Sequence, residues 1–404
     1  MEKNCRLFAV LALVVTAILA QDAAPAAGAP APAAGAPAPA AGDLGQRISA
    51  LQQRGAEFLL SKQLPSGAWM EHPAISALAC LGIADAPQYG QDDVKAKIDR
   101  ALDFIASNAQ ADGSISDPRD RRSYPVYNTS ICLIGLLRFN RPQDLPIIKK
   151  ARAYLLSADV YPEGSADVAD VAAGQQTPAA GHGYGRKHRA DLNNTAWALE
   201  ALYLSDHLDR EPFNNDPQAA KKADLAWDKA RSFLTLCQNL ADTNQSAWVK
   251  SAPDNDRGGF IYCPSDALQP DAKPQSLRAY GSMTYSGLKS LIYAKVDKND
   301  ARVQAAFAWI GKNYTLDENP GIGDSGLYYY YHTFGKALTL FADADLTGAD
   351  GQKHPWRQDL VAALAKRQKA DGSWSNDLSG RWMESIPELS TCYCLMTLGV
   401  IKER

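Results

Sequence analysis

The sequence lacks an excess of charge of either sign, since 42 Lys and Arg residues stand against 45 Asp and Glu residues and give a formal net charge of −3. This balance excludes the strongly basic surface of a nucleic-acid-binding domain. Alternating apolar and polar residues, the pattern of half-buried strands, are nearly absent, which excludes an all-β fold. Cysteines are few and widely spread in a chain long enough to build its own core, so we expect buried free thiols after residue 20.

The N-terminal apolar run, residues 7–20, is too short to cross a membrane comfortably. It follows the basic residues Lys3 and Arg6, and a short apolar run after a basic segment is typical of a signal peptide. We therefore expect residues 1–20 to be a signal peptide that exports the protein to the periplasm or the extracellular space. If it were not cleaved, the same segment would act as an N-terminal anchor.

Residues 21–42 form an Ala/Pro-rich tract that contains the near-repeat Ala-Ala-Gly-Ala-Pro-Ala-Pro. The tract has no large apolar side chains to bury, and its prolines favour extended backbone, so it is predicted to be a semi-rigid linker. The folded domain is therefore expected to occupy residues 43–404.

Internal repetition is the strongest positive signal in that domain. An aromatic–aliphatic pair, weaker in the last unit, recurs at Phe58-Leu59, Phe104-Ile105, Tyr154-Leu155, Phe233-Leu234, Trp309-Ile310 and Ala363-Leu364. In three units a glutamine follows the first residue of the pair by five positions, namely Gln63, Gln238 and Gln368. In three units a glycine follows it by nine positions, namely Gly67, Gly113 and Gly372. Such columns at fixed spacing predict repeated structural units.

Each unit also contains a second, more uniformly apolar helix with a threonine near its start. The threonine column is Thr129, Thr195, Thr284, Thr333 and Thr391, with Ala74 in its place in the first unit. A threonine there can satisfy an unpaired backbone N–H. A striped helix followed by a uniformly apolar one predicts an outer and an inner helix. We therefore predict an all-α fold, a single α6/α6 toroid of six helix–loop–helix repeats, with an open solenoid as the alternative.

Two polar insertions, at residues 157–190 and 239–275, lengthen the third and fourth units. In repeat proteins such insertions usually lie on one rim and often carry function.

Two segments carry a family resemblance. Gln63-x-x-x-Gly67-Ala-Trp69 and Gln368-Lys-Ala-Asp-Gly-Ser-Trp374 resemble the Gln…Trp repeats of squalene–hopene cyclases. Residues 46–402 are similar to the prenyltransferase/squalene-cyclase repeat superfamily. This resemblance implies an α6/α6 toroid with a mostly apolar central cavity, and it implies no particular reaction.

The segment Asp191-Leu-Asn193-Asn194-Thr-Ala resembles the Asp-x-Asp-Asp-Thr-Ala motif with which class II terpene cyclases protonate an alkene. Asn193 and Asn194 stand where that family carries the proton donor and its neighbour, and an amide has no acidic proton to give. Ser390 stands where protein prenyltransferases carry their last zinc-binding histidine, and no Asp-x-Cys pair occurs. We therefore expect neither a metal nor another cofactor.

The candidate site is the group of residues just before the threonine column, because inner-helix N-termini face one end of a toroid's cavity. Asp191 and His332 are the predicted catalytic residues, with a helix cap and a structural histidine as the alternatives. The predicted ligand-binding residues are His182, Tyr184, Asn193, Asn194, Tyr280, Tyr285, Tyr328, Tyr331, Trp382 and Glu388. This aromatic set suits an apolar or sugar ligand. His188, Arg189, Asp324 and Glu384 lie in the same segments.

Three functions fit these features. The first is an exported terpene cyclase-like protein that binds, and in its enzymatic version transforms, an apolar isoprenoid-type ligand through a degenerate acid motif. The second is a non-catalytic toroid that binds an apolar small molecule, a lipid or a partner protein. The third is a polysaccharide-acting α/α toroid. No nucleic-acid partner and no transmembrane segment after signal cleavage are expected.

Overall fold

The computed structural model describes residues 44–402, apart from residues 118, 120–123, 161–178, 186–187, 265–276 and 342–344. The predictions of a signal peptide and a linker concern residues 1–42, which lie outside the described part. Parts of both predicted insertions lie outside it as well. Among the described helices, none combines the length and apolar character needed to cross a membrane.

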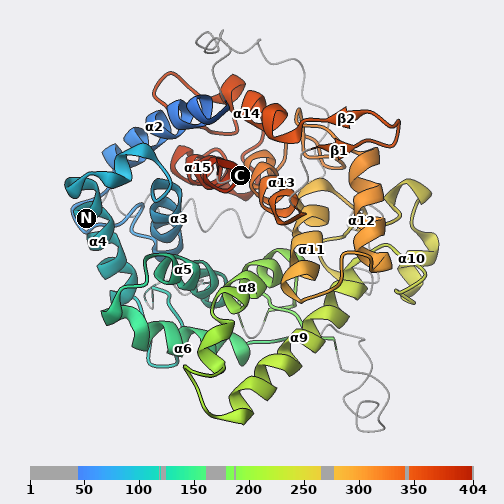
Figure 1. The fold of residues 1–404 in the computed structure, drawn as a ribbon, viewed down its shortest axis with the longest axis horizontal. Helices are drawn as coiled ribbons and strands as arrows, with labels where there is room; N and C mark the ends of the chain where they lie inside the picture. Colours follow the sequence, from blue (N-terminus) through green and yellow to red (C-terminus); the bar gives the residue numbers. More distant parts are fainter. Residues whose placement is uncertain are drawn as a thin grey trace.

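The described helices form two concentric rings (Figure 1). The inner ring consists of α3 (Pro73–Ile83), α5 (Pro125–Phe139), α8 (Leu192–Leu204), α11 (Gly281–Tyr293), α13 (Leu327–Phe341) and α15 (Pro387–Lys402). Each inner helix contacts the next, and α15 contacts α3, so the inner ring is closed. The outer ring consists of α2 (Leu44–Lys62), α4 (Asp92–Ser107), α6 (Leu145–Leu156), α9 (Pro217–Cys237), α12 (Ala301–Lys312) and α14 (Trp356–Arg367). The predicted all-α toroid is confirmed.

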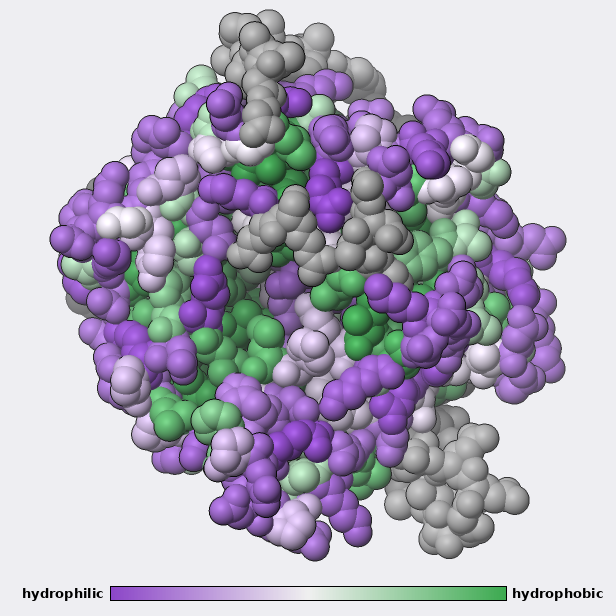
Figure 2. All heavy atoms as spheres, viewed as in Figure 1, coloured by the Kyte–Doolittle hydropathy of each residue, from purple (hydrophilic) through white to green (hydrophobic). Residues whose placement is uncertain are grey.

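The helices differ in burial as their sequence patterns predict. Every residue of α3 is buried, whereas α4 buries one stripe at Val94, Ile98, Ala101, Leu102 and Ile105. An inner helix is surrounded by others and an outer helix is not, so only the outer helix keeps a polar face. Figure 2 shows this arrangement on one face of the molecule, where hydrophilic side chains dominate the periphery and apolar side chains gather nearer the centre.

Short elements connect the helices. A hairpin lies between α13 and α14 in the chain. It pairs β1 (Leu346–Thr347) with β2 (Lys353–His354) in antiparallel register, with Leu346 opposite His354. The remaining short elements are α10 (Ala247–Ser251) and the 3₁₀ turns η2 (Pro87–Gly90), η3 (Pro142–Asp144), η4 (Asp206–Asp209), η5 (Asp254–Asp256) and η8 (Arg381–Met383).

The glutamine column joins neighbouring outer helices. In each of three units the side-chain amide donates one hydrogen bond to a glycine carbonyl in its own turn and one to a backbone carbonyl of the next outer helix. The donors are Gln63, Gln238 and Gln368, and the carbonyls on the next helix belong to Lys97, Arg302 and Leu51. The bond from Gln368 to Leu51, at 3.0 Å, links the last outer helix to the first.

The glycine column packs against the same neighbouring helices. Gly67, Gly113, Gly258 and Gly372 all have φ between +87° and +92°, and a Cβ there would lie 2.1–2.6 Å from a backbone oxygen of the next outer helix. Only glycine allows both the conformation and the approach. The sequence pattern found three of these glycines and missed Gly258, because 20 positions rather than four separate it from its glutamine.

The threonine column satisfies backbone N–H groups, as predicted, and these groups belong to the preceding turn rather than to the inner helix itself. The hydroxyl accepts a hydrogen bond from a backbone N–H of the preceding turn, as Thr129 does from Ile115 and Thr391 does from Trp374. In the first unit Ser76 takes this role by accepting from the Trp69 N–H, so Ala74 is not the equivalent residue. The column therefore ties the preceding turn to the inner helix in these units and through Thr195 and Thr284, whereas the Thr333 hydroxyl donates to the Tyr330 carbonyl of its own helix.

The six described cysteines are free and buried, as predicted: Cys80, Cys132, Cys237, Cys263, Cys392 and Cys394.

Candidate functional site: an aromatic cavity at the inner-helix N-termini

A cavity of about 250 Å³ lies where the inner helices begin. Its wall is mostly aromatic and includes the side chains of Tyr124, Tyr127, Tyr184, Tyr262, Tyr280, Tyr329, Tyr393 and Trp382. Apolar and polar residues complete it: Ile75, Met283, Met383, Leu389, His72, His188, Asn193, Ser282 and Glu384. The residues come from all parts of the chain, so only the closed ring brings them together.

Both insertions contribute to this wall, as expected for rim segments. Tyr184 and His188 come from the first insertion, and Tyr262 comes from the second. Tyr184 packs against Tyr124 and Tyr127, which lie at the start of α5, with ring centroids 4.6 and 6.2 Å apart. The described parts of both insertions therefore contribute side chains to the cavity wall.

Asn193 lines the cavity in the first turn of α8, whereas its neighbours Asp191 and Asn194 are buried behind the wall. Asp191 is the N-cap of α8, with one carboxylate oxygen accepting from the Asn194 N–H at 2.9 Å and the other from the Asn194 side-chain amide at 2.7 Å. Of the three polar residues Asp191, Asn193 and Asn194, it is therefore the amide of Asn193 that reaches the cavity.

Burial raises the pKa of Asp191 to about 6, against the lowering effects of its hydrogen bonds from Asn194 and Tyr262 and of the nearby Arg189 charge. The ordinary pKa of an aspartate is near 3.9. Because the folded state holds the proton more tightly than the unfolded state, this group favours folding at low pH and loses that contribution as the pH rises through 6.

We predict that the free energy of unfolding of the wild type, measured relative to Asp191→Asn, falls by about 2.4 kcal/mol between pH 4 and pH 7.5. Urea unfolding of both proteins at several pH values measures this difference. The asparagine keeps a side-chain oxygen for the helix cap but does not titrate. A difference that stays constant with pH would contradict the assigned shift.

Glu384 is the buried carboxylate of the cavity, with 1% of its surface exposed. One oxygen accepts from the backbone N–H of Tyr329 at 2.7 Å, and the other accepts from the Asn376 side-chain amide at 3.1 Å. Burial raises its pKa, although the backbone N–H groups at the start of α13 and the Asn376 amide lower it. The side chain of Glu384, which precedes α15 in the chain, therefore caps the N-terminus of the neighbouring inner helix α13.

Trp382 forms part of the cavity wall in a strained conformation. Trp382 and Met383 have φ of +55° and +66°, which side-chain-bearing residues rarely adopt. The Arg381 guanidinium lies over the Trp382 ring, 4.4 Å from its centroid. Trp382 lines the cavity, whereas Arg381 is not part of its wall.

His332 does not line the cavity. It is fully buried, its ring stacks between those of Trp197 and Tyr393, and neither ring nitrogen has a hydrogen-bond partner among the described residues. Burial lowers its pKa well below the ordinary value, and the nearby charges of Lys336 and Lys289 lower it further. A neutral, enclosed imidazole cannot touch a ligand in the cavity.

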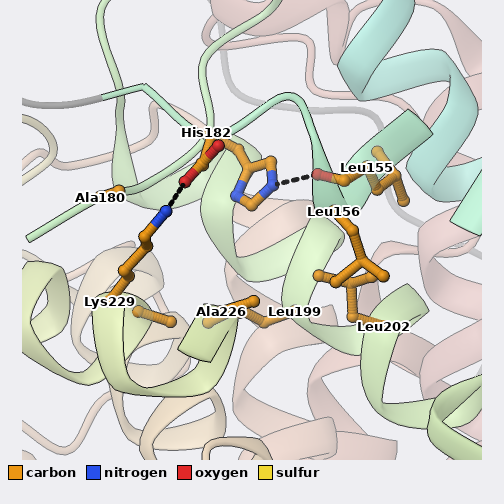
Figure 3. A pocket seen from close by; sticks show the side chains of 10 residues that line it. Leu155, Leu156, Ala180, His182, Leu199, Leu202, Ala226 and Lys229 are labelled. Atoms are coloured by element: carbon orange, nitrogen blue, oxygen red, sulfur yellow. Dashed lines mark hydrogen bonds and ion pairs between the residues drawn. The ribbon is translucent and has the colours of Figure 1, made fainter. Parts of the chain in front are cut away.

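His182 lies beside a separate, water-sized pocket of about 10 Å³ between α6, α8 and α9 (Figure 3). Its Nε2 is 3.1 Å from the carbonyl oxygen of Leu155, and the nearby Lys229 ammonium donates to Asp159. Burial lowers the pKa of His182. This side chain therefore packs between helix layers rather than at the cavity.

Four other predicted ligand-binding residues also lie outside the cavity wall. Tyr285 packs against Phe334, and Glu388 is half-buried near the start of α15. Tyr328 and Tyr331 share one face of α13, as their spacing predicts, but that face points away from the cavity. Their hydroxyls donate to the carbonyls of Ser375 and Leu316.

The neighbouring Tyr329 is the member of this run that lines the cavity. Sequence reasoning placed Tyr184, Asn193, Tyr280 and Trp382 at the site, and the structure brings these four together. It missed His72, Tyr124, Tyr127, Tyr262 and Tyr393. The signal that could have found them was their position near inner-helix starts or in an insertion.

In the described residues, no group of three or more His, Cys, Asp or Glu side chains could hold a metal ion.

No protein family's sequence profile and no curated protein sequence matches this chain. Among solved structures, the type II terpene cyclase MstE from Scytonema, in complex with geranylgeranyl dihydroxybenzoate, is similar with a TM-score of 0.50 at 12% identity, over 89% of this chain and 98% of that chain. An alpha-amylase from Clostridium perfringens is similar with a TM-score of 0.52 at 12% identity, over 88% of this chain and 98% of that chain. The chain thus has a terpene cyclase-like α/α toroid fold, which proteins of different activity share.

Proposed function

We propose that this protein is an exported binding toroid whose aromatic cavity takes up a small, largely apolar molecule of isoprenoid type and does not transform it. The observation that carries this proposal is Asn193, an amide in the cavity wall at the position of the cyclases' proton donor. Without an acidic proton there, alkene protonation has no donor in the place where that family provides one.

The size of the cavity favours a small ligand. Its volume of about 250 Å³ is below the roughly 300–1,000 Å³ of pockets for drug-sized ligands. A ligand smaller than a typical drug-sized molecule therefore suits this cavity best, and a ten-carbon isoprenoid is a suitable probe.

The two predicted catalytic residues support binding over catalysis. Both carboxylate oxygens of Asp191 accept hydrogen bonds from Asn194, and the residue is 2% exposed. His332 is enclosed by aromatic rings away from the cavity. Neither side chain is placed to reach a ligand held between the tyrosines.

We predict that geraniol, a ten-carbon isoprenoid alcohol, binds the purified protein and that Met283→Trp weakens this binding at least tenfold. Met283 lines the cavity and is almost fully buried, so an indole at this position takes up space that the ligand needs. Isothermal titration calorimetry measures the affinities, and mass spectrometry of the incubated geraniol is expected to show no product.

The matched control is Met283→Leu, a volume-conserving change that is expected to keep the affinity. Thermal unfolding of each variant checks that it is folded. Equal geraniol binding by the tryptophan variant would place the ligand elsewhere. Binding of maltose without binding of geraniol would favour a glycan-acting toroid instead, and conversion of geraniol would contradict the non-catalytic proposal.

A further inference from the structure

Glu384 is a buried carboxylate in the cavity wall without a cationic partner. In the part of the chain that the structure describes, it forms no ion pair with a lysine or arginine, and its hydrogen bonds come from amides. Carboxylates are rarely fully buried unless they are paired. The N-terminus of α13 offsets only part of the charge, since a helix end is equivalent to roughly half an elementary charge.

The described part of the wall contains no permanently charged cation either. None of the described residues that line the cavity is a lysine or an arginine. Arg381 is exposed and is not part of the wall, although it lies over the Trp382 ring and its charge acts on the wall residue Tyr280. The cavity therefore combines a buried carboxylate with a wall that contains no lysine or arginine.

The aromatic wall is suited to a positive charge. The faces of tyrosine and tryptophan rings attract cations, and several such rings around one space form the aromatic cages that bind quaternary ammonium groups. Here seven tyrosines and Trp382 surround one space. Tyr329 and Tyr393, for example, have ring centroids 5.5 Å apart on two neighbouring inner helices.

We propose that this cavity binds a small alkylated ammonium, whose methyl groups and charge contact the tyrosine rings while Glu384 provides the opposite charge. This inference rests on one part of the proposed function, that the cavity binds a small molecule, and differs from it in assigning that molecule a positive charge. A quaternary ammonium group has an apolar surface and a delocalised charge, so it satisfies the largely apolar wall and the unpaired carboxylate together.

The test compares choline with 3,3-dimethylbutan-1-ol, an uncharged molecule of the same shape, by calorimetry at low salt. Choline is expected to bind at least tenfold more tightly. Glu384→Gln is expected to weaken choline binding about tenfold and to leave the neutral probe unchanged. Tyr280→Leu removes one aromatic ring and leaves the cap that Glu384 forms on α13 intact. This change is expected to weaken the binding of choline more than the binding of the neutral probe. The control Glu318→Gln changes an exposed carboxylate outside the cavity wall and is expected to change neither affinity.

The outcomes separate this inference from the proposed function. Equal binding of the two probes, or geraniol binding without choline binding, overturns the ammonium proposal and leaves the binding cavity in place. Failure of choline, the neutral probe and geraniol to bind overturns both. If Glu384→Gln does not fold, the ratio of the two wild-type affinities and the Tyr280→Leu variant still decide the question.

Discussion

Glu200→Gln is expected to lower the free energy of unfolding by about 3–5 kcal/mol. Glu200 is fully buried in α8, where its Oε2 is 2.8 Å from the ammonium of Lys289 and its Oε1 bonds to the ammonium of Lys336. Removing the carboxylate charge leaves two ammonium groups whose charges act on each other without the carboxylate that both contact. The two lysines come from α11 and α13, so the effect reports directly on how these three inner helices meet.

The comparison variant is Lys95→Gln, which removes an ion pair to Asp92 on the surface of α4 and is expected to cost less than about 1 kcal/mol. Urea unfolding at pH 7 measures both variants. The lysine charges hold the pKa of Glu200 well below its ordinary value despite burial. Its contribution is therefore fully present above the unfolded-state pKa near 4.3 and is lost only as the pH falls through the lower folded-state value. Similar losses of unfolding free energy in the two variants would contradict the stabilising role assigned to Glu200 and its two lysine partners.

Gly372→Ala is expected to destabilise the protein by about 3 kcal/mol or more, because two unfavourable effects add. The residue has φ of +87°, and a Cβ there would lie 2.4 Å from the backbone oxygen of Arg54. Arg54 belongs to the first outer helix and Gly372 follows the last, so the clash falls where the two ends of the outer ring meet. A backbone oxygen in a helix cannot move aside as a flexible side chain can.

Gly351→Ala is the matched control, since Gly351 has a similar φ of +79° but nothing within 4 Å of the added Cβ. It is expected to show only the conformational cost of about 1–2 kcal/mol. Chemical unfolding measures the loss of unfolding free energy in each variant. The difference between the two losses gives the cost of the clash where the two ends of the outer ring meet. Equal destabilisation would mean that the close approach of Gly372 to Arg54 contributes nothing.

The toroid was predictable because its repeat columns are local devices at fixed spacing. Gln368, Gly372 and Trp374 lie within one turn and bond within that turn or to adjacent helices, so the same spacing returns wherever the same junction is built. The prediction failed where an insertion changes the spacing, as at Gly258. For the threonine column, the spacing shows that a hydroxyl recurs near a backbone N–H, but it does not show that this N–H belongs to the preceding turn.

The cavity was predictable only in part. Asn193 and Tyr280 lie at inner-helix starts, where position along the chain determines which end of the ring a residue faces. Within α13 the choice between Tyr328 and Tyr329 depends on a rotation of about 100° per residue, which the threonine spacing does not determine. Tyr262 reaches the wall from an insertion, whose path follows from tertiary contacts rather than from any repeat.

The most direct test of the binding-cavity account is a crystal structure of the protein grown with geraniol. The account predicts electron density for one geraniol molecule inside the ring, in contact with Asn193, Tyr280 and Trp382, and unchanged in covalent structure. Density for geraniol only outside the ring, with the cavity filled by water, would contradict it, as would density for a cyclised product.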